Sequence, residues 1–167
     1  GVIVDAASGV TGAGRKADYA YSFTTVDENF SAYGLVNHRN TPEMEQEIGG
    51  QVLFTPHHVP MSRGLLATCY SRPAGDVDSD AVMEVMREFA RHEPFVTATD
   101  SPPETKSVRG ANAAHISARF DERTSTVVSM CAIDNLTKGA SGGALQSANI
   151  ALGLDETSGL STIGLAP

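Results

Sequence analysis

The chain has 167 residues, of which 41% are hydrophobic and 19% are charged, and its formal net charge at pH 7 is -8. This length suits one domain with its own hydrophobic core. The acidic balance excludes a non-specific nucleic-acid binder, which needs surplus Lys and Arg to neutralise phosphates, but it allows a small anionic substrate held by a local cluster of cations.

The first third of the chain predicts short strands around a glycine-rich loop. Residues 2–5 read as a buried strand, residues 6–16 ("AASGVTGAGRK") as the loop, and residues 19–25 ("YAYSFTT") as a second strand, because they are rich in aromatic and β-branched side chains. Residues 41–48 predict a short helix, in which Thr41 caps the amino terminus and Pro42 takes the first position.

The rest of the chain predicts more strands and two longer helices. Residues 51–55 and 63–71 read as strands on either side of the turn-like "PHHVPMS". Residues 78–91 give the best helix pattern: Asp78 or Ser79 can cap it, and Val82, Val85, Met86 and Phe89 fall at helical spacing. Residues 95–99 predict a strand, residues 113–120 and 125–133 an antiparallel hairpin around "DERT", and residues 136–152 a long helix of small residues.

This order of elements predicts one α+β domain over residues 1–167. Strands dominate, and the helices do not alternate with them strictly, which favours a mixed, largely antiparallel sheet covered by helices. Cys69 and Cys131 both lie inside apolar runs, so we expect two buried thiols in a reducing compartment rather than a disulfide. The chain shows no membrane span and no signal peptide, and its start without Met suggests a fragment or a processed piece.

Two polar segments near the amino terminus could carry chemistry. In "SGVTGAGRK" (residues 8–16) three glycines would let the backbone approach a ligand, and Ser8, Thr11, Arg15 and Lys16 offer donors; a flexible surface turn fits equally well. The pair His38-Arg39 joins a proton shuttle to an anion-binding group, although local sequence alone favours an exposed polar helix entry.

Two further segments lie later in the chain. On a strand, His57 and His58 would point to opposite faces and could not easily share a metal, whereas in a loop they could together bind zinc. Arg63 suits an anion anchor or a rim salt bridge. Asp134 and Asn135 end an apolar strand, and Gly139, Gly142 and Gly143 follow inside an expected helix. Glycines there need a reason, which is either close packing or a ligand that passes over the helix.

Four blocks, in order, resemble N-acetyl-gamma-glutamyl-phosphate reductase of the aspartate-semialdehyde dehydrogenase superfamily. They are "DAASGVTGAGRK", "AYGLVNHRNTPEMEQEIG", "FTPHHVPMSRGLLAT" and "AIDNLTKGASGGALQSANIALGLDETSGL", and they cover nearly the whole chain. The family's Rossmann half, with its dinucleotide fingerprint, and its Cys nucleophile motif do not occur in these residues. The resemblance therefore implies the catalytic and dimerisation domain alone, with helices on one face of the sheet as in the carboxy-terminal domain of glyceraldehyde-3-phosphate dehydrogenase.

The resemblance also implies chemistry and site residues. In the family, NADPH reduces a thioester formed when Cys displaces phosphate from an acyl phosphate, a His relays a proton, and Arg side chains hold anionic groups. His38 matches the first His of the block H-R-H-T-P-E and Asn40 replaces its second His, which would impair the chain if the relay belongs there. The expected substrate-binding residues are Arg15, Arg39 and Arg63, and the expected NADP-contacting residues are Ser8, Gly9 and Asn135.

The implied partners are a small acyl-phosphate substrate and a second copy of the chain, with no nucleic acid, membrane or metal, in the cytoplasm. Without a nucleophile and a cofactor fold, the chain alone should be inactive. Two alternatives stay open. One is a non-catalytic dimerisation or partner-binding module of the same fold, and the other is a lysine-pathway reductase domain that acts on an aminoadipyl phosphate.

Overall fold

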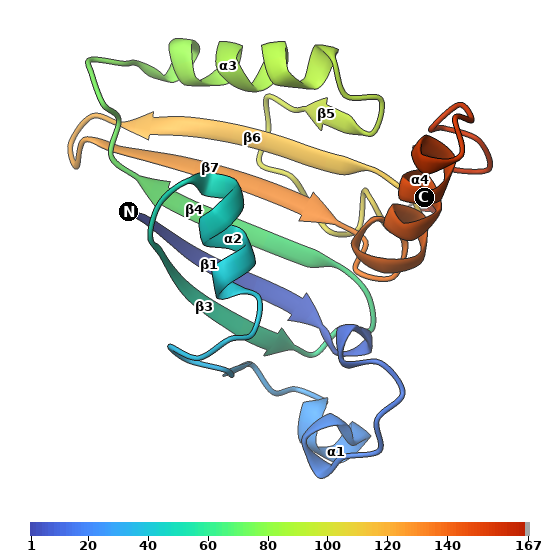
Figure 1. Ribbon diagram of the computed structural model, residues 1–167. Coiled ribbons are helices and arrows are strands. Elements are labelled where there is room, and N and C mark those ends of the chain that lie inside the picture. The colour runs from blue at the N-terminus through green and yellow to red at the C-terminus, as the bar shows by residue number, and fades with distance from the viewer. Residues whose placement is uncertain (166–167) are drawn as a thin grey trace.

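β1 (Val2–Gly9) lies near the centre of a seven-stranded sheet in the computed structural model, which describes residues 1–165. The strand order is β2-β3-β1-β4-β7-β6-β5 (Figure 1), where β2 is Ser31–Ala32, β6 is Ala114–Asp121 and β7 is Thr126–Ile133. β1 pairs in parallel with β3 (Val52–Val59) and antiparallel with β4 (Leu65–Ser71), and β5 (Val96–Ala98) pairs in parallel with β6. All the other pairs are antiparallel, so the expected mixed, largely antiparallel sheet is confirmed.

The helices lie in front of the sheet and around its border. Figure 1 shows α2 (Thr41–Ile48) crossing the front of the sheet, α3 (Ser79–Arg91) running along its upper border, and α4 (Gly142–Ala151) at its right-hand end. The short α1 (Phe23–Val26) protrudes below. The hairpin of β6 (Ala114–Asp121) and β7 (Thr126–Ile133) forms as predicted. Among the described residues, no helix has the length and apolar character that a membrane crossing requires.

α3 protects an edge of the sheet. β5 pairs only with the first part of β6, which leaves backbone groups of Ala118 and Phe120 without a neighbouring strand. The hydroxyl of Ser79 accepts a hydrogen bond from the Phe120 N–H (3.0 Å) and donates one to the Phe120 carbonyl (3.2 Å), while the Met83 sulfur accepts from the Ala118 N–H (3.4 Å). Because an open strand edge invites pairing with other chains, these contacts replace a missing strand.

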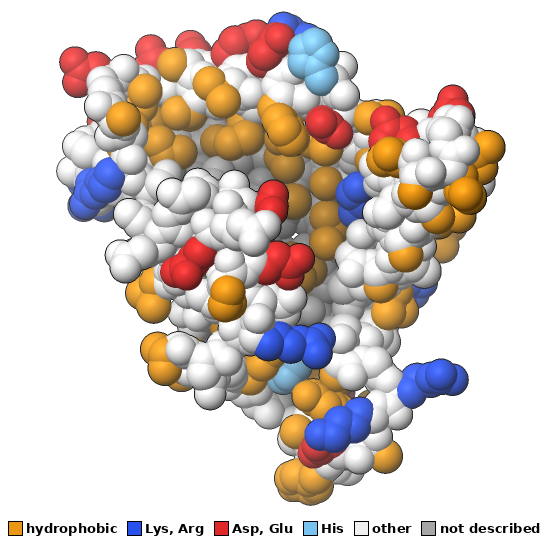
Figure 2. All heavy atoms as spheres, in the orientation of Figure 1, with side chains coloured by type: hydrophobic (Ala, Val, Ile, Leu, Met, Phe, Trp, Pro, Cys, Tyr) orange, Lys and Arg blue, Asp and Glu red, His pale blue; other side chains and the backbone are white. Residues whose placement is uncertain are grey.

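The buried stripe of α3 differs from the predicted one. Met83 is its buried residue, at 4% exposure, whereas Val85 and Phe89 are 67% and 57% exposed. The helix follows a strand edge rather than lying flat on the sheet, so it buries a narrower stripe than the sequence pattern suggests. Figure 2 shows hydrophobic side chains along the underside of α3, where they border a hollow above the sheet. The predicted helix start is confirmed, because Asp78 accepts a hydrogen bond from the Ala81 N–H (2.7 Å).

The expected strand at residues 19–25 is wrong. The segment forms a 3₁₀ helix, Tyr19–Tyr21, followed by α1. Asp18 accepts a hydrogen bond from the Ala20 N–H (3.1 Å), and the hydroxyls of Ser22 and Thr25 lie 2.9 Å apart. Such local side-chain bonds compete with strand pairing and outweigh the β propensity of the aromatic residues. The short β2 (Ser31–Ala32) follows and pairs with β3.

β1 and β3 are both longer than predicted. β1 continues through Ser8 to Gly9, and β3 takes in Pro56, His57 and His58, which the sequence placed in a turn. The Pro56 carbonyl accepts from the Tyr33 N–H (3.0 Å), so the proline nitrogen faces the β2 side and not β1. A strand accepts proline where its missing N–H faces an edge, and the ladder between β3 and β1 stays intact.

The glycines of the last helix serve close packing. The region expected to be one helix is a π-helix, Thr137–Ser141, followed by α4. A side chain at Gly142 would overlap the Asn112 amide oxygen, and one at Gly143 would lie 2.8 Å from the Lys138 carbonyl. Packing therefore accounts for both residues, and no passing ligand is needed to explain them.

The two cysteines are free and half-buried. They lie on adjacent strands, where Cys69 is opposite Ser129 and Cys131 is opposite Ala67. Burial, reinforced by Cys69, raises the pKa of the Cys131 thiol to about 11, and burial also raises the pKa of Cys69. Since the thiolate is the nucleophile, neither side chain suits nucleophilic catalysis at neutral pH.

Candidate active site

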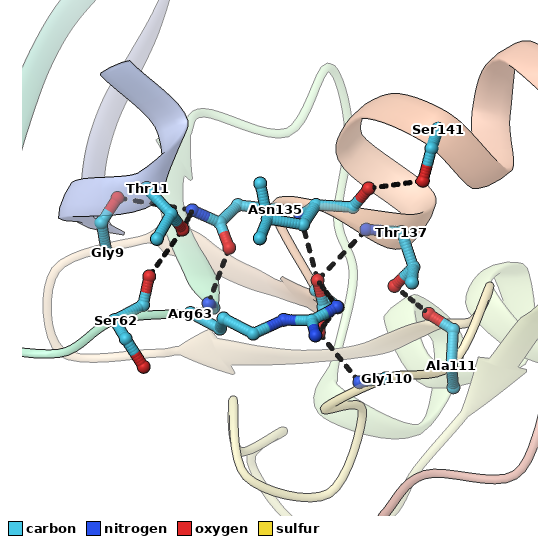
Figure 3. Close-up of polar contacts among 12 residues, drawn as sticks. Gly9, Thr11, Ser62, Arg63, Gly110, Ala111, Asn135, Thr137 and Ser141 are labelled. Carbon is cyan, nitrogen blue, oxygen red and sulfur yellow. Dashed lines mark hydrogen bonds and ion pairs between the residues drawn. The ribbon is translucent and has the colours of Figure 1, made fainter. Parts of the chain in front are cut away.

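Asp134 and Asn135, at the carboxyl end of β7, bind three segments that are distant in sequence: residues 9–11, residues 63–64 and Gly110 (Figure 3). The Asp134 side chain is fully buried. It accepts hydrogen bonds from the backbone N–H groups of Gly110, Leu136 and Thr137 at 2.7, 2.8 and 3.0 Å, and it pairs with Arg63 at 2.9 Å. The Asp134 carboxylate therefore fixes the start of the last helical region against the loop that precedes β6.

The hydrogen-bond partners of Asp134 keep its carboxyl ionised although it is buried. Burial by itself would raise the pKa of this carboxyl, but the hydrogen bond from Arg63 and the three backbone donors lower it to about 2. Arg63 is thus committed to a buried ion pair, with 28% of its side chain exposed. The expectation that Arg63 binds the substrate stays a prediction, and only the part of its guanidinium outside this pair could serve it.

The side-chain amide of Asn135 also makes its hydrogen bonds within the chain. Its amide nitrogen donates to the Gly9 carbonyl and to the Thr11 hydroxyl, both at 3.1 Å, and its oxygen accepts from the Gly64 N–H at 2.9 Å. Backbone bonds from Gly9, Val10 and Thr11 to residues 61–64 complete the connection. The glycine-rich segment is therefore not a free turn at its start. A side chain at Gly9 would come within 3.0 Å of the Arg63 backbone nitrogen, so close packing requires glycine there.

His38 lies in a separate cluster of aromatic and imidazole rings that packs against β3. Its imidazole meets the Phe54 ring edge-on, with centroids 4.9 Å apart, and the Tyr33 ring with centroids 5.7 Å apart. Tyr33 in turn stacks on His58, with centroids 3.9 Å apart and planes 7° from parallel. The imidazole is half-buried, whereas Arg39 beside it is exposed.

The entry to α2 fixes the orientation of His38. The Asn40 N–H donates to its Nδ1 at 3.3 Å, so a neutral imidazole carries its proton on Nε2. This leaves Nε2 as the nitrogen that can exchange a proton with a substrate. Thr41 is the first residue of the helix and not its cap, contrary to prediction; Asn40 stands at the cap position, and its side chain binds Glu43 at 3.0 Å.

The two clusters meet through the pairing of β1 with β3. Ser8 on β1 lies directly opposite His58 on β3, so the glycine-rich segment and the ring cluster border the same end of the sheet. The structure thus brings Ser8, Gly9, Asn135 and Arg63 to one side of this end and His38 with Arg39 to the other. Arg15 is exposed beyond the first 3₁₀ helix, Val10–Ala13, and makes no ion pair among the described residues.

His57 and His58 point to opposite faces of β3, as the sequence predicts. His57 contacts the Phe30 ring, with centroids 5.1 Å apart, and His58 faces Tyr33. The Nδ1 atom of His58 is buried without a hydrogen-bond partner, and burial lowers the pKa of His58. No group of three or more His, Cys, Asp or Glu side chains within residues 1–165 could hold a metal ion.

Residues 1–135 match the family model described as semialdehyde dehydrogenase, dimerisation domain. The chain belongs to this family. It is similar to N-acetyl-gamma-glutamyl-phosphate reductases of Desulforudis audaxviator (46% identical over 99% of this chain and 50% of the relative) and Acetivibrio thermocellus (47% identical over 98% of this chain and 49% of the relative). The chain spans about half the length of the curated relatives it matches.

Solved structures show the same fold for this dimerisation domain. Aspartate semialdehyde dehydrogenase II of Vibrio cholerae, complexed with ASA, superposes with a TM-score of 0.72 at 17% identity, over 90% of this chain and 54% of that one. A probable aspartate-semialdehyde dehydrogenase from Pseudomonas aeruginosa gives a TM-score of 0.71 at 16% identity, with the same coverage. The fold expected from the family resemblance is therefore confirmed.

Sequence reasoning missed the surroundings of His38. Tyr33 and Phe54 contact it and His58 stacks on Tyr33, but Tyr33 lies some twenty residues before the strand that carries the other two. The available signal was strand alternation: if β3 is extended through Pro56, residues 54 and 58 share one face. Reading "PHHVPMS" as a turn concealed this relation.

Proposed function

We propose that this chain is the substrate-binding and dimerisation half of an NADP-dependent reductase that converts N-acetyl-gamma-glutamyl phosphate to N-acetylglutamate semialdehyde in the cytoplasm. One observation carries the proposal: relatives named for this reaction are 41 to 47% identical over 98 to 99% of the chain. The 167 residues contain neither the nucleophile motif nor a dinucleotide fingerprint. Both would come from the other half of such an enzyme.

His38 is the proposed proton relay. A thioester that accepts hydride forms a tetrahedral adduct whose oxygen gains charge, and a positioned imidazole lowers the barrier by exchanging a proton with it. The bond from Asn40 to Nδ1 presents Nε2 for this exchange. Arg39, exposed beside it, is free to attract the phosphate or carboxylate of the substrate.

Asn135 fits an NADP contact poorly. Both hydrogens of its amide nitrogen are used within the chain, so it has no donor left for the nicotinamide carboxamide. Ser8 is the better candidate, because its hydroxyl makes only a long 3.4 Å bond to the carbonyl of Gly9. NADP would supply hydride when bound, and the groups in this chain would position the acyl substrate and move the proton.

The sheet offers a surface for a second copy of the chain. Ile3 and Leu53 are opposite one another on β1 and β3, on the face away from His58, and are 46% and 54% exposed. Leu66 and Met130 share this face and are half-buried. Exposed apolar side chains on a sheet face favour self-association, which agrees with the domain type.

The test is a reductase assay on two preparations. The chain alone should not oxidise NADPH above background when the acyl phosphate is supplied, and the chain joined to its cofactor-binding half should do so. An aminoadipyl phosphate serves as the competing substrate. Preference for it would support the lysine-pathway alternative, and inactivity of the joined protein toward both would support a non-catalytic module.

A further inference from the structure

We propose that His58 is a positioning residue for His38 and acts through Tyr33. It would neither move a proton nor touch the substrate. Its flat ring would keep the Tyr33 ring in place, and Tyr33 would keep the imidazole of His38 aligned with the bond from Asn40. This inference rests on the proposed relay role of His38.

Three ring contacts carry the inference. His58 and Tyr33 stack almost parallel, with centroids 3.9 Å apart. The Tyr33 ring then meets His38 at 5.7 Å and 63°. Tyr21 meets His58 at 5.6 Å and 85°, so the stack is supported from a second direction. Edge-to-face contacts such as those of His38 with Tyr33 and of Tyr21 with His58 are favoured ring geometries, so the contacts of the stack restrain the rings on either side of it.

β3 sets the spacing of the walls around His38. Phe54 and His58 are four residues apart on one strand, and alternation places both on the same face. Phe54 meets His38 directly, whereas His58 reaches it through Tyr33. Gly34 closes a third side, since a side chain there would come within 3.1 Å of the His38 ring. His38 is therefore held on three sides, with Nδ1 bonded to the backbone.

The buried Nδ1 atom of His58 does not explain why a histidine stands at this position. Nδ1 is buried and has no hydrogen-bond partner, so a protein that needed only a polar group there would gain nothing from it. The feature of His58 that the structure uses is its planar ring, which stacks on Tyr33. The His58 position should then accept another flat ring and reject a non-planar side chain of similar volume.

The experiment compares His58→Leu, His58→Phe and His57→Ala in the 167-residue chain. The nitrogen-15 shifts of the His38 ring report which nitrogen is protonated and whether the tautomer is fixed. In the unmodified chain, Nδ1 should behave as an acceptor and Nε2 as a protonated nitrogen, with well-separated shifts. His58→Leu should draw the two shifts together as the ring loses its fixed position. His58→Phe should keep them apart, and so should His57→Ala on the opposite face.

The inference is overturned if His58→Leu leaves the shifts of a folded chain unchanged, or if His58→Phe perturbs them as much as His58→Leu does. If His58→Leu does not fold, Tyr33→Leu removes the same stack and takes its place. In the joined enzyme His58→Leu should lower kcat on the order of tenfold, with KM unchanged and activity restored by His58→Phe. If the joined enzyme has no reductase activity, the proposed function fails, but the nitrogen shifts still decide the positioning role.

Discussion

Asp134 shows how one side chain can connect parts of the chain that are distant in sequence. It binds Arg63, 71 positions earlier, and the Gly110 backbone, and it does so without exposure to water. Burying a charge is costly unless partners compensate for it, and breaking such a pair leaves the other charge uncompensated. The acidic side chain at this position should therefore matter more for folding than any exposed acidic residue.

The first prediction is that Asp134→Asn lowers the free energy of unfolding by about 3 kcal/mol, because Arg63 loses its partner and an amide cannot accept all of the donors. Urea denaturation of the purified chain measures this loss. Asp100→Asn is the matched control: Asp100 pairs with Arg87 at 2.7 Å but is 82% exposed, so its loss should cost less than about 1 kcal/mol. Equal effects of the two substitutions would contradict the argument.

The second prediction concerns how the free energy of unfolding changes at acidic pH. In the folded chain the Asp134 pKa is lowered from 3.8 to about 2, so between these values the unfolded chain binds more protons. The stability that this group contributes, about 2 kcal/mol, is complete above pH 4 and should disappear as the pH falls toward 2. The difference in unfolding free energy between the original chain and Asp134→Asn should shrink over this range. A constant difference from pH 6 to pH 2 would refute the assigned pKa.

At the scale of elements, α3 both packs on the core and covers the unpaired edge of β6 with hydrogen bonds. Its first residue, Ser79, makes two hydrogen bonds to Phe120 on the open side of β6.

The third prediction is that Ser79→Ala destabilises the chain by about 1 to 2 kcal/mol, because two backbone groups lose their partner. Ser147→Ala is the control, since that hydroxyl bonds only to the Gly143 carbonyl in its own helix; thermal unfolding should hardly change there.

Local patterns predicted the elements whose bonds are local. The β6–β7 hairpin could be read from its loop and α3 from its cap and helical spacing. The range of α2 could be read from Thr41 and Pro42, although Asn40 and not Thr41 stands at the cap position. Residues 19–25 could not, because Asp18 and Ser22 favour turns that β propensity ignores. The full length of β3 could not either, because Pro56 is acceptable only where its nitrogen faces an edge, which is a property of the sheet.

The same distinction applies to the candidate site. The sequence indicated His38, Arg63 and the Asp134-Asn135 pair as polar residues at element ends, and all of them lie at such ends. It could not indicate that Asn135 bonds to Gly9, 126 positions earlier, or that Arg63 pairs with Asp134. These bonds form only when β1, β4 and β7 are assembled, so they show a role of both side chains in the fold, while their expected contacts with substrate and NADP stay predictions.

At the scale of the whole molecule, we predict self-association through the face of the sheet that carries Ile3 and Leu53. Light scattering at micromolar concentration should give a mass above that of the 17.5 kDa chain. Leu53→Lys should shift the mass toward that of a monomer, because a charge cannot be buried there without a partner. Phe23→Lys on the protruding α1, where Phe23 is 78% exposed, should leave the mass unchanged. A monomeric original chain would contradict the proposed interface.

The central claim is that His38 moves a proton in a reductase of which this chain forms one half. Its most direct test is the turnover of His38→Gln in the enzyme joined to its cofactor-binding half. Gln retains hydrogen bonding but cannot titrate, so turnover should fall at least about a hundredfold and the pH–rate profile should lose one limb. Folding and NADP affinity should remain nearly unchanged. Turnover within a few-fold of the original enzyme would contradict the claim and leave His38 and Arg39 as a polar entry to α2.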